Sequence, residues 1–173
     1  MKDQPTAGAG VSSDIIAQSI QQHSSYIVAA VASGYPKYAS SEWDANHSVN
    51  HSMLNQVKSE KAAGGWQASS DDSEQWIGVC FGSPKKVVKV ALQGRSDNKQ
   101  RVTQFRVKYS LDGLIWHFAD DEAYFEGVWD SNTVKTHLFK KPFLARSVRI
   151  NPTAWNEHIS LRFEVYFEES TQL

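Results

Sequence analysis

Two polar stretches contain most of the side chains suited to binding a polar ligand. Residues 44–52 read DANHSVNHS and follow Trp43, and residues 95–101 read RSDNKQR. A polar ligand needs hydrogen-bond donors and acceptors in fixed geometry, which Asp, Asn, His and Arg side chains provide. A flat indole ring packs against the apolar face of a ligand or receives a protein side chain. The candidate ligand-binding residues are Trp43, Asp44, Asn46, His47, Arg95, Asp97, Asn98, Lys99 and Arg101.

Catalytic and zinc chemistry are poorly matched by this sequence. His47 and His51 are four residues apart, which brings two zinc ligands together only on a helix, and this Ser- and Asn-rich stretch is not helical in pattern. No Ser–His–Asp arrangement, phosphate loop or credible carboxylate pair is recognisable. We therefore expect a binding protein that is not an enzyme and requires no cofactor. For any single polar residue, a solvated loop is the alternative.

Charge and composition exclude further classes. The 173 residues favour one domain, and 18 basic against 19 acidic residues give a net charge of −1. A nucleic-acid partner is not expected, because the basic footprint that recruits phosphates is missing. A single cysteine excludes an intrachain disulfide, and residues 1–14 lack the apolar core of a signal peptide. A cytoplasmic or non-classically exported protein is favoured over signal-peptide secretion.

The elements that position these stretches are predicted to be strands. Apolar alternation begins at Trp76 and is cleanest at residues 160–169, where Leu161, Phe163, Val165 and Phe167 face one way and Arg162, Glu164, Tyr166 and Glu168 the other. Asp112-Gly113 predicts a two-residue hairpin turn. Short strands with frequent turn signals indicate an all-β sandwich or barrel.

The N-terminal region is harder to assign. Residues 15–31 fit either a short helix or an opening strand, and residues 33–73 read as a long loop, a kind of segment that is often functional. We expect three parts in the chain. These are a partly flexible extension over residues 1–32, a folded domain over 33–168 and a tail over 169–173.

Nine motifs, in order and at suitable spacing, resemble the discoidin domain family, and most closely its slime-mould discoidin lectins. They are ASSEW (39–43), GGW (64–66), QW (75–76), VALQGR (90–95), VTQF (102–105), YSLDG (109–113) with Trp116, FEGVWD (125–130), ARSVRINPTAW (145–155) and HISLRFEVY (158–166). The resemblance covers about residues 38–167. Two features differ from the family. Phe167 stands near the position where the extracellular members have their final cysteine. The slime-mould lectins carry a second lectin domain after this one, whereas the given sequence ends at Leu173.

The resemblance implies an eight-stranded antiparallel jelly-roll-like β-sandwich or barrel of the galactose-binding-domain type, with ligand loops at one end. It places residues 44–52 and 95–101 at that end and assigns Trp66, Trp76, Trp116 and Trp155 to the packed framework. Trp43 corresponds to an exposed aromatic of collagen-binding relatives, although simple loop packing is the alternative. Arg95 corresponds to an arginine at the base of its loop, where it binds ligand or only braces the loop through an ion pair.

The function implied by the resemblance is carbohydrate binding, of galactose or N-acetylgalactosamine type, in cell adhesion. Its partner would be a glycan or glycoprotein, with homo-oligomers supplying avidity. The alternative is a protein–protein interaction module of intracellular or complex-assembly type. Membrane insertion is not expected, because the loops lack pairs of large apolar residues. Some carbohydrate-binding relatives hold a structural calcium, for which Asn55 and Glu164 are the candidate ligands.

Overall fold

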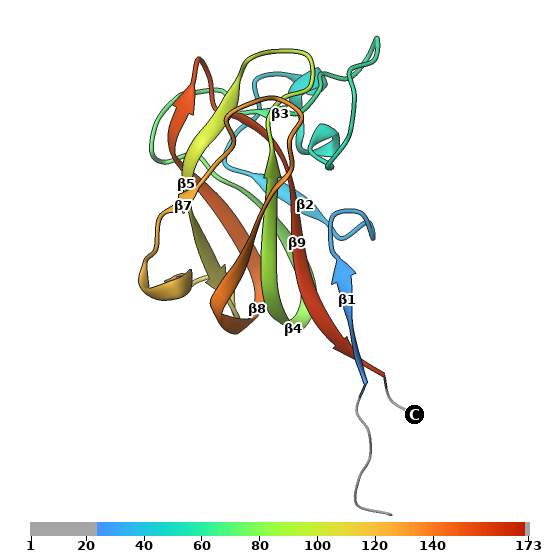
Figure 1. Ribbon diagram of the computed structural model, residues 1–173, viewed down its shortest axis with the longest axis vertical. Helices are drawn as coiled ribbons and strands as arrows, with labels where there is room; N and C mark the ends of the chain where they lie inside the picture. Colours follow the sequence, from blue (N-terminus) through green and yellow to red (C-terminus); the bar gives the residue numbers. More distant parts are fainter. Residues whose placement is uncertain (1–23, 172–173) are drawn as a thin grey trace, which may run out of the picture.

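The computed structural model describes residues 24–171, and all of their strands pair antiparallel in one nine-stranded sheet (Figure 1). Three short 3₁₀ turns complete the elements, and no helix of residues 24–171 is long and apolar enough to cross a membrane. The elements are β1 (Ser25–Ala29), β2 (Lys37–Ala39), η1 (Ala45–His47), η2 (Val49–His51), β3 (Trp66–Gln67), β4 (Ile77–Gln93), β5 (Arg101–Ser110), β6 (His117–Phe118), η3 (Ala119–Asp121), β7 (Phe125–Glu126), β8 (Lys135–Asn156) and β9 (Ser160–Ser170).

Two long strands join the two layers of the sandwich. The strand order is β1-β9-β4-β8-β5-β6, while β2 pairs with β4, β3 with β9 and β7 with β5. Residues 77–79 of β4 pair with β2, whereas residues 86–93 pair with β9, and the β4–β8 register shifts between Cys80 and Lys85. The sheet is not closed into a barrel. The sandwich form is therefore confirmed. Nine strands are found where eight were expected, and three of them, β3, β6 and β7, have only two residues each.

The alternation of the last strand is confirmed, and its inner face forms part of the core. Leu161, Phe163, Val165 and Phe167 are each 0% exposed and belong to one apolar cluster between the layers. The opposite face is not simply solvated, however. Arg162 is 1% exposed and Glu164 is 2% exposed, because loops and the β1 region cover that side of β9. Sequence alternation identified the core face and did not reveal that Arg162 and Glu164 on the polar face are buried too.

The ambiguous segment before residue 32 is a strand where the structure describes it. β1 (Ser25–Ala29) pairs antiparallel with β9, from Ser25 opposite Ser170 to Ala29 opposite Tyr166. The folded unit therefore begins upstream of residue 33, and β9 continues to Ser170, within the expected tail. The rest of the expected extension, residues 1–23, lies outside the described residues.

The predicted two-residue turn at Asp112-Gly113 is wrong. β5 ends at Ser110 and β6 begins at His117, so the connection covers residues 111–116. Gly113 has a φ of +77°, but Asp112 is not among the positive-φ residues that the two-residue turn requires. Instead, the Asp112 carboxylate accepts hydrogen bonds from the backbone N–H groups of Leu114 (2.8 Å) and Ile115 (2.9 Å), which stabilises a longer turn.

The predicted framework tryptophans divide into two groups. Trp66 is 0% exposed, so core packing is confirmed for it. Trp155 is half-buried and packs against the core. Trp76 and Trp116 are also half-buried, but they hold the Arg149 guanidinium between them, with its central carbon 3.7 Å from each ring centroid. The core assignment of these two is wrong, because each ring is used for a cation–π contact outside the core.

Candidate functional site

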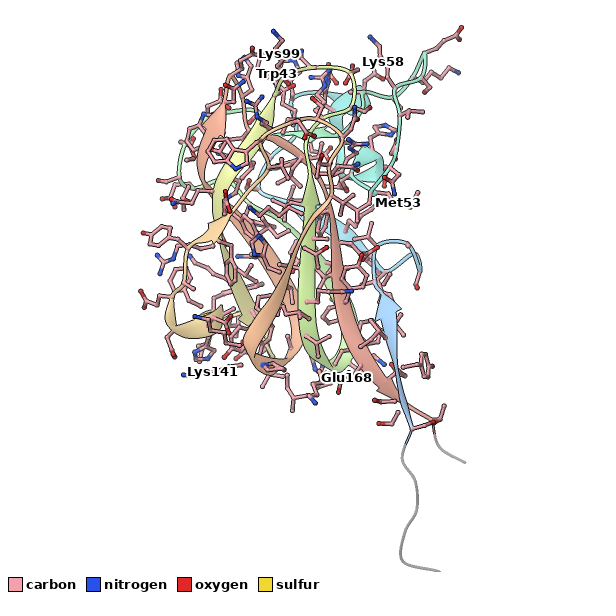
Figure 2. All side chains as sticks on the ribbon, viewed as in Figure 1. Trp43, Met53, Lys58, Lys99, Lys141 and Glu168 are labelled. Atoms are coloured by element: carbon pink, nitrogen blue, oxygen red, sulfur yellow. The ribbon has the colours of Figure 1, made fainter. Side chains whose placement is uncertain are left out.

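Loops from three parts of the chain meet at one end of the sandwich. We call this end the tip and define it as residues 43–63, 94–100 and 127–134. Figure 2 shows Trp43, Lys58 and Lys99 together there, with Lys141 and Glu168 at the other end. The two polar stretches singled out in the sequence therefore lie on the same end of the molecule.

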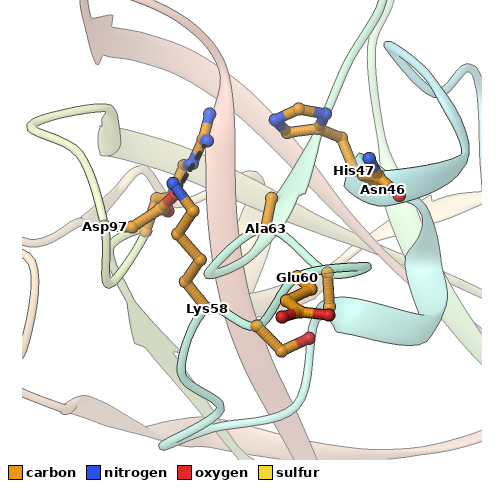
Figure 3. Close-up of a pocket in the computed structure, with 9 residues that line it drawn as sticks. Asn46, His47, Lys58, Glu60, Ala63 and Asp97 are labelled. Carbon is orange, nitrogen blue, oxygen red and sulfur yellow. Dashed lines mark hydrogen bonds and ion pairs between the residues drawn. The ribbon is translucent and has the colours of Figure 1, made fainter.

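A small open cavity of about 190 Å³ lies in the tip between the first two loops (Figure 3). Both predicted stretches contribute to it, together with the loop over residues 58–63. Its wall combines cationic, anionic and amide side chains, which suits a polar ligand with several hydroxyl groups. The cavity is lined by Asn46, His47, Lys58, Ser59, Glu60, Ala62, Ala63, Arg95 and Asp97.

Arg95 and Asp97 form the rigid wall of this cavity. Arg95 Nε donates to Asp97 Oδ1 at 2.7 Å and Arg95 Nη2 to Asp97 Oδ2 at 3.1 Å, which is a bidentate ion pair. Arg95 Nη1 donates to Gln67 Oε1 (2.9 Å) and Gln100 Oε1 (2.8 Å). Because most of its donors are used in this way, the structure bears out the bracing role for Arg95, and ligand contact stays a prediction.

The Asp97 carboxylate is strongly held in its ionised form. Burial alone would raise its pKa, but the hydrogen bonds from Arg95 and from the Gly64 N–H outweigh burial and lower the pKa to about 2. The Gly64 N–H lies 3.0 Å from Asp97 Oδ1. A Cβ at Gly64 would lie 2.0 Å from Ser96 Oγ, so only glycine allows this close approach. Lys58 Nζ lies 3.7 Å from Asp97 Oδ2 at the mouth of the cavity.

The opposite wall is organised by Asp44, although Asp44 does not line the cavity. Its Oδ1 accepts hydrogen bonds from the backbone of Asn46 (2.9 Å) and His47 (3.1 Å), which caps η1, and lies 2.6 Å from His47 Nδ1. The hydrogen bond to His47 is the main cause of the lowered pKa of Asp44. His47 Nε2 has no hydrogen-bond partner within residues 24–171, so it is the ring nitrogen available to a ligand.

The remaining predicted residues do not line the cavity. Trp43 is 56% exposed; its backbone N–H donates to Gln67 O (2.9 Å), and its ring centroid is 6.4 Å from that of His158. Lys99 O accepts hydrogen bonds from Arg101 Nη1 (2.7 Å) and Asn156 Nδ2 (3.0 Å). Asn98 and Lys99 are exposed on the outer side of their loop.

A buried arginine that the sequence did not single out connects the loops of the tip. Arg162 of β9 donates from Nη1 to Gln56 O (2.7 Å), from Nε to Gly94 O (2.7 Å) and from Nη2 to Ser131 O (2.5 Å). Burial lowers its pKa, and the charge of Asp97 opposes that shift. Its position on the polar face of β9 gave no signal of this role. Lys58 and Glu60 were also missed, because isolated charges in a long loop have no distinctive pattern.

The two calcium candidates, Glu164 and Asn55, each accept hydrogen bonds from other groups of the protein. Glu164 Oε1 accepts from the Val31 N–H (2.6 Å) and Oε2 from the Ala32 N–H (2.8 Å); burial raises the pKa of Glu164, and these bonds oppose the shift. Asn55 Oδ1 accepts from Gln93 Nε2 at 3.2 Å. Within residues 24–171 no three His, Cys, Asp or Glu side chains are grouped to hold a metal. The pair therefore offers no converging donor set, and calcium there stays a prediction.

The fold and the loop-built tip are those of a discoidin-type recognition domain. The chain belongs to the F5/8 type C domain family, whose model matches residues 36–165. Among curated relatives, Discoidin-2 of Dictyostelium discoideum is 35% identical over 133 residues, covering 74% of this chain and 52% of the relative. Lactadherin of Rattus norvegicus is 36% identical over 105 residues, covering 58% of this chain and 25% of the relative. The chain thus spans about half the length of the first of these relatives and a quarter of the second.

Solved structures agree with this assignment. Wild-type discoidin II from Dictyostelium discoideum matches with a TM-score of 0.78 and 32% identity, over 82% of this chain and 58% of that one. The family 32 CBM from C. perfringens NanJ, solved in complex with galactose, matches with a TM-score of 0.64 and 20% identity, over 82% of this chain and 99% of that one. The second likeness concerns the fold alone. The resemblance seen in the nine motifs is confirmed.

Proposed function

We propose that this domain binds galactose-type glycans in the tip cavity and that it acts as a recognition module in cell adhesion, without catalysis. The observation that supports this most directly is the preformed polar cavity, whose walls are fixed by the Arg95–Asp97 and Asp44–His47 pairs. A rigid site avoids the entropic cost of ordering side chains when a weakly binding sugar enters.

The cavity offers complementary groups for a hexose. The Asn46 amide and Lys58 Nζ supply donors, while the Asp97 and Glu60 carboxylates supply acceptors. His47 Nε2 is a further acceptor, because His47 Nδ1 carries the proton donated to Asp44. The exposed indole of Trp43, on the same end of the molecule, offers a flat surface to the apolar face of a second ring or of a glycan arm. The galactose found with the NanJ module, which shares this fold, motivates galactose as the first ligand to test.

Isothermal titration of the folded domain with galactose and N-acetylgalactosamine, at up to millimolar concentration, tests the proposal. We expect measurable binding of one of these sugars and weaker binding of glucose, whose C4 hydroxyl is equatorial where that of galactose is axial. Arg95→Ala should lower the affinity at least about tenfold, because it releases both Asp97 and Gln67 from their fixed positions. Trp43→Ala should stay folded and also bind less tightly.

The matched control is Arg146→Ala, which removes an exposed arginine of β8 outside the tip. This variant should bind sugar as the unmodified domain does. If the folded domain binds none of the three sugars at millimolar concentration, the proposal is wrong. If Arg95→Ala and Arg146→Ala bind equally well, the sugar does not use the cavity.

A further inference from the structure

Trp129 is an exposed tryptophan in the third loop of the tip, separate from the cavity. Its side chain is 68% exposed, more than that of Trp43 at 56%. Tryptophan buries a large apolar area when it packs, so a mostly exposed ring gives up much of that stabilisation. The FEGVWD segment contains it, directly after the short strand β7. No packing role within residues 24–171 accounts for the exposed face of this ring.

The orientation of the Trp129 ring is nevertheless fixed. Its Nε1 donates to Glu126 Oε1 at 2.7 Å, and the other carboxylate oxygen of Glu126 accepts from Lys135 Nζ. His137 Nε2 contacts the Glu126 carbonyl oxygen at 2.7 Å. The bonds from Lys135 and Trp129 lower the pKa of Glu126, so its carboxylate stays an ionised acceptor. An exposed ring held in one orientation loses little conformational entropy on binding.

The loop that follows Trp129 is tied to the predicted ligand loops. Asp130 Oδ1 accepts from the backbone N–H groups of Asn132 (2.7 Å) and Thr133 (2.6 Å), which closes a tight turn. Ser131 Oγ then donates to Asn98 O at 2.7 Å, and Asn98 directly follows the cavity residue Asp97. Arg162 holds the same loop through Ser131 O. Trp129 is therefore in a fixed position relative to the cavity.

Three of the predicted residues that do not line the cavity, Asn98, Lys99 and Arg101, lie between Asp97 and the Trp129 loop. Asn98 and Lys99 are exposed there, and Arg101 lies beside Asp130, close enough for its charge to help lower the pKa of that carboxylate. Amide, ammonium and guanidinium groups donate hydrogen bonds to sugar hydroxyls. A ligand longer than one sugar would meet these groups in turn after leaving the cavity.

We propose that Trp129, with Glu126 and Lys135, forms a second sugar-binding subsite, so that the domain's ligand is an oligosaccharide. One sugar occupies the tip cavity, the glycan crosses the Asn98–Lys99 surface, and a later sugar stacks its apolar face on the Trp129 indole. Lys135 and the carboxylate of Glu126, both accessible beside the ring, bond to hydroxyls at the edge of that sugar. This inference rests on the function proposed above.

The test compares two ligands on the same domain by titration calorimetry: free galactose, and a panel of tri- and tetrasaccharides that end in galactose with different linkages. The unmodified domain should bind at least one oligosaccharide more tightly than galactose. Trp129→Ala should lower that affinity about five- to tenfold and change galactose affinity less than about twofold. Trp129→Phe, which keeps a flat ring, should restore most of the loss.

A control variant separates stacking from a general loss of exposed apolar surface. Leu114→Ala shortens a side chain that is 85% exposed in the turn between β5 and β6, and it should bind both ligands normally. The subsite is contradicted if Trp129→Ala binds every oligosaccharide normally or if no oligosaccharide binds more tightly than galactose. If galactose itself does not bind, the proposed function fails with it, which is a distinguishable result.

Discussion

The two ends of strand β5 present opposite kinds of surface. The loop before it, residues 94–100, contains Arg95 and Asp97, whose charged groups bond to each other and to neighbouring loops. The turn after it, residues 111–116, exposes Leu111, Leu114 and Ile115, which are 51%, 85% and 62% exposed. In that turn, among residues 24–171, the Asp112 carboxylate bonds only to Ser110 and to local backbone. Loops of similar length are thus fixed by long-range side-chain hydrogen bonds at one end and by local hydrogen bonds at the other, where Trp116 adds a cation–π contact with Arg149.

This difference shows where precise geometry is maintained. A polar ligand site requires donors and acceptors within a few tenths of an ångström, which local turn bonds alone do not guarantee. At the tip, the buried guanidinium groups of Arg95 and Arg162 connect segments far apart in the chain. The apolar turn has no such connection from a buried side chain in the described residues. We therefore expect substitutions at the two ends to differ sharply in effect.

The largest effect is expected for Arg162→Ala. This change leaves three carbonyl oxygens without their donor and removes the connection between three loops, so we expect a loss of roughly 3 kcal/mol or more in the free energy of unfolding. Urea unfolding followed by tryptophan fluorescence measures it. Arg146→Ala, an exposed arginine, should cost less than about 0.5 kcal/mol. Equal costs for the two variants would show that the tip does not depend on Arg162.

An intermediate effect, dependent on pH, is expected from Asp97. Its folded pKa of about 2 lies below the usual value of 3.8, so its stabilising contribution is complete above that value and is lost as the pH falls through about 4 to 2. Allowing for solvent screening, the contribution is about 1 kcal/mol. Asp97→Asn should therefore be less stable at pH 7 and lose less stability on acidification.

Urea midpoints at several pH values between 7 and 2 measure this dependence. Glu74→Gln, which changes an exposed carboxylate outside the tip, serves as the control and should keep the acid sensitivity of the unmodified domain. The same steep loss in Asp97→Asn as in the unmodified domain would contradict the role given to the Arg95–Asp97 pair.

The smallest effect is expected at the apolar turn. Leu114→Ser removes a side chain that is 85% exposed, so the free energy of unfolding should change by less than about 0.5 kcal/mol, and galactose affinity should not change. Urea unfolding and calorimetric titration of the same preparation measure both. A loss comparable to that of Arg162→Ala would mean that the two ends of β5 are not as different as their contacts indicate.

The sequence by itself determined that the fold is all-β, which face of β9 points inward, and which two polar stretches form loops. These follow from local patterns, because side chains alternate along a strand and because clustered Asn, Asp and Ser residues favour loops. These three features can be seen within short windows of residues. The resemblance to the discoidin family, by contrast, placed Arg95 at the base of its loop, where the structure finds it buried and paired.

Only the tertiary structure decided which polar residues are buried and which lie together. Arg162 and Glu164 have the alternating position of solvent-facing residues, yet loops from other parts of the chain cover them. Arg149 of β8 contacts Trp76, which directly precedes β4, and Trp116, in the turn before β6. Lys58 reaches the cavity from a loop whose sequence has no distinctive pattern. These contacts join residues tens of positions apart, and packing between the segments determines them; composition and periodicity do not.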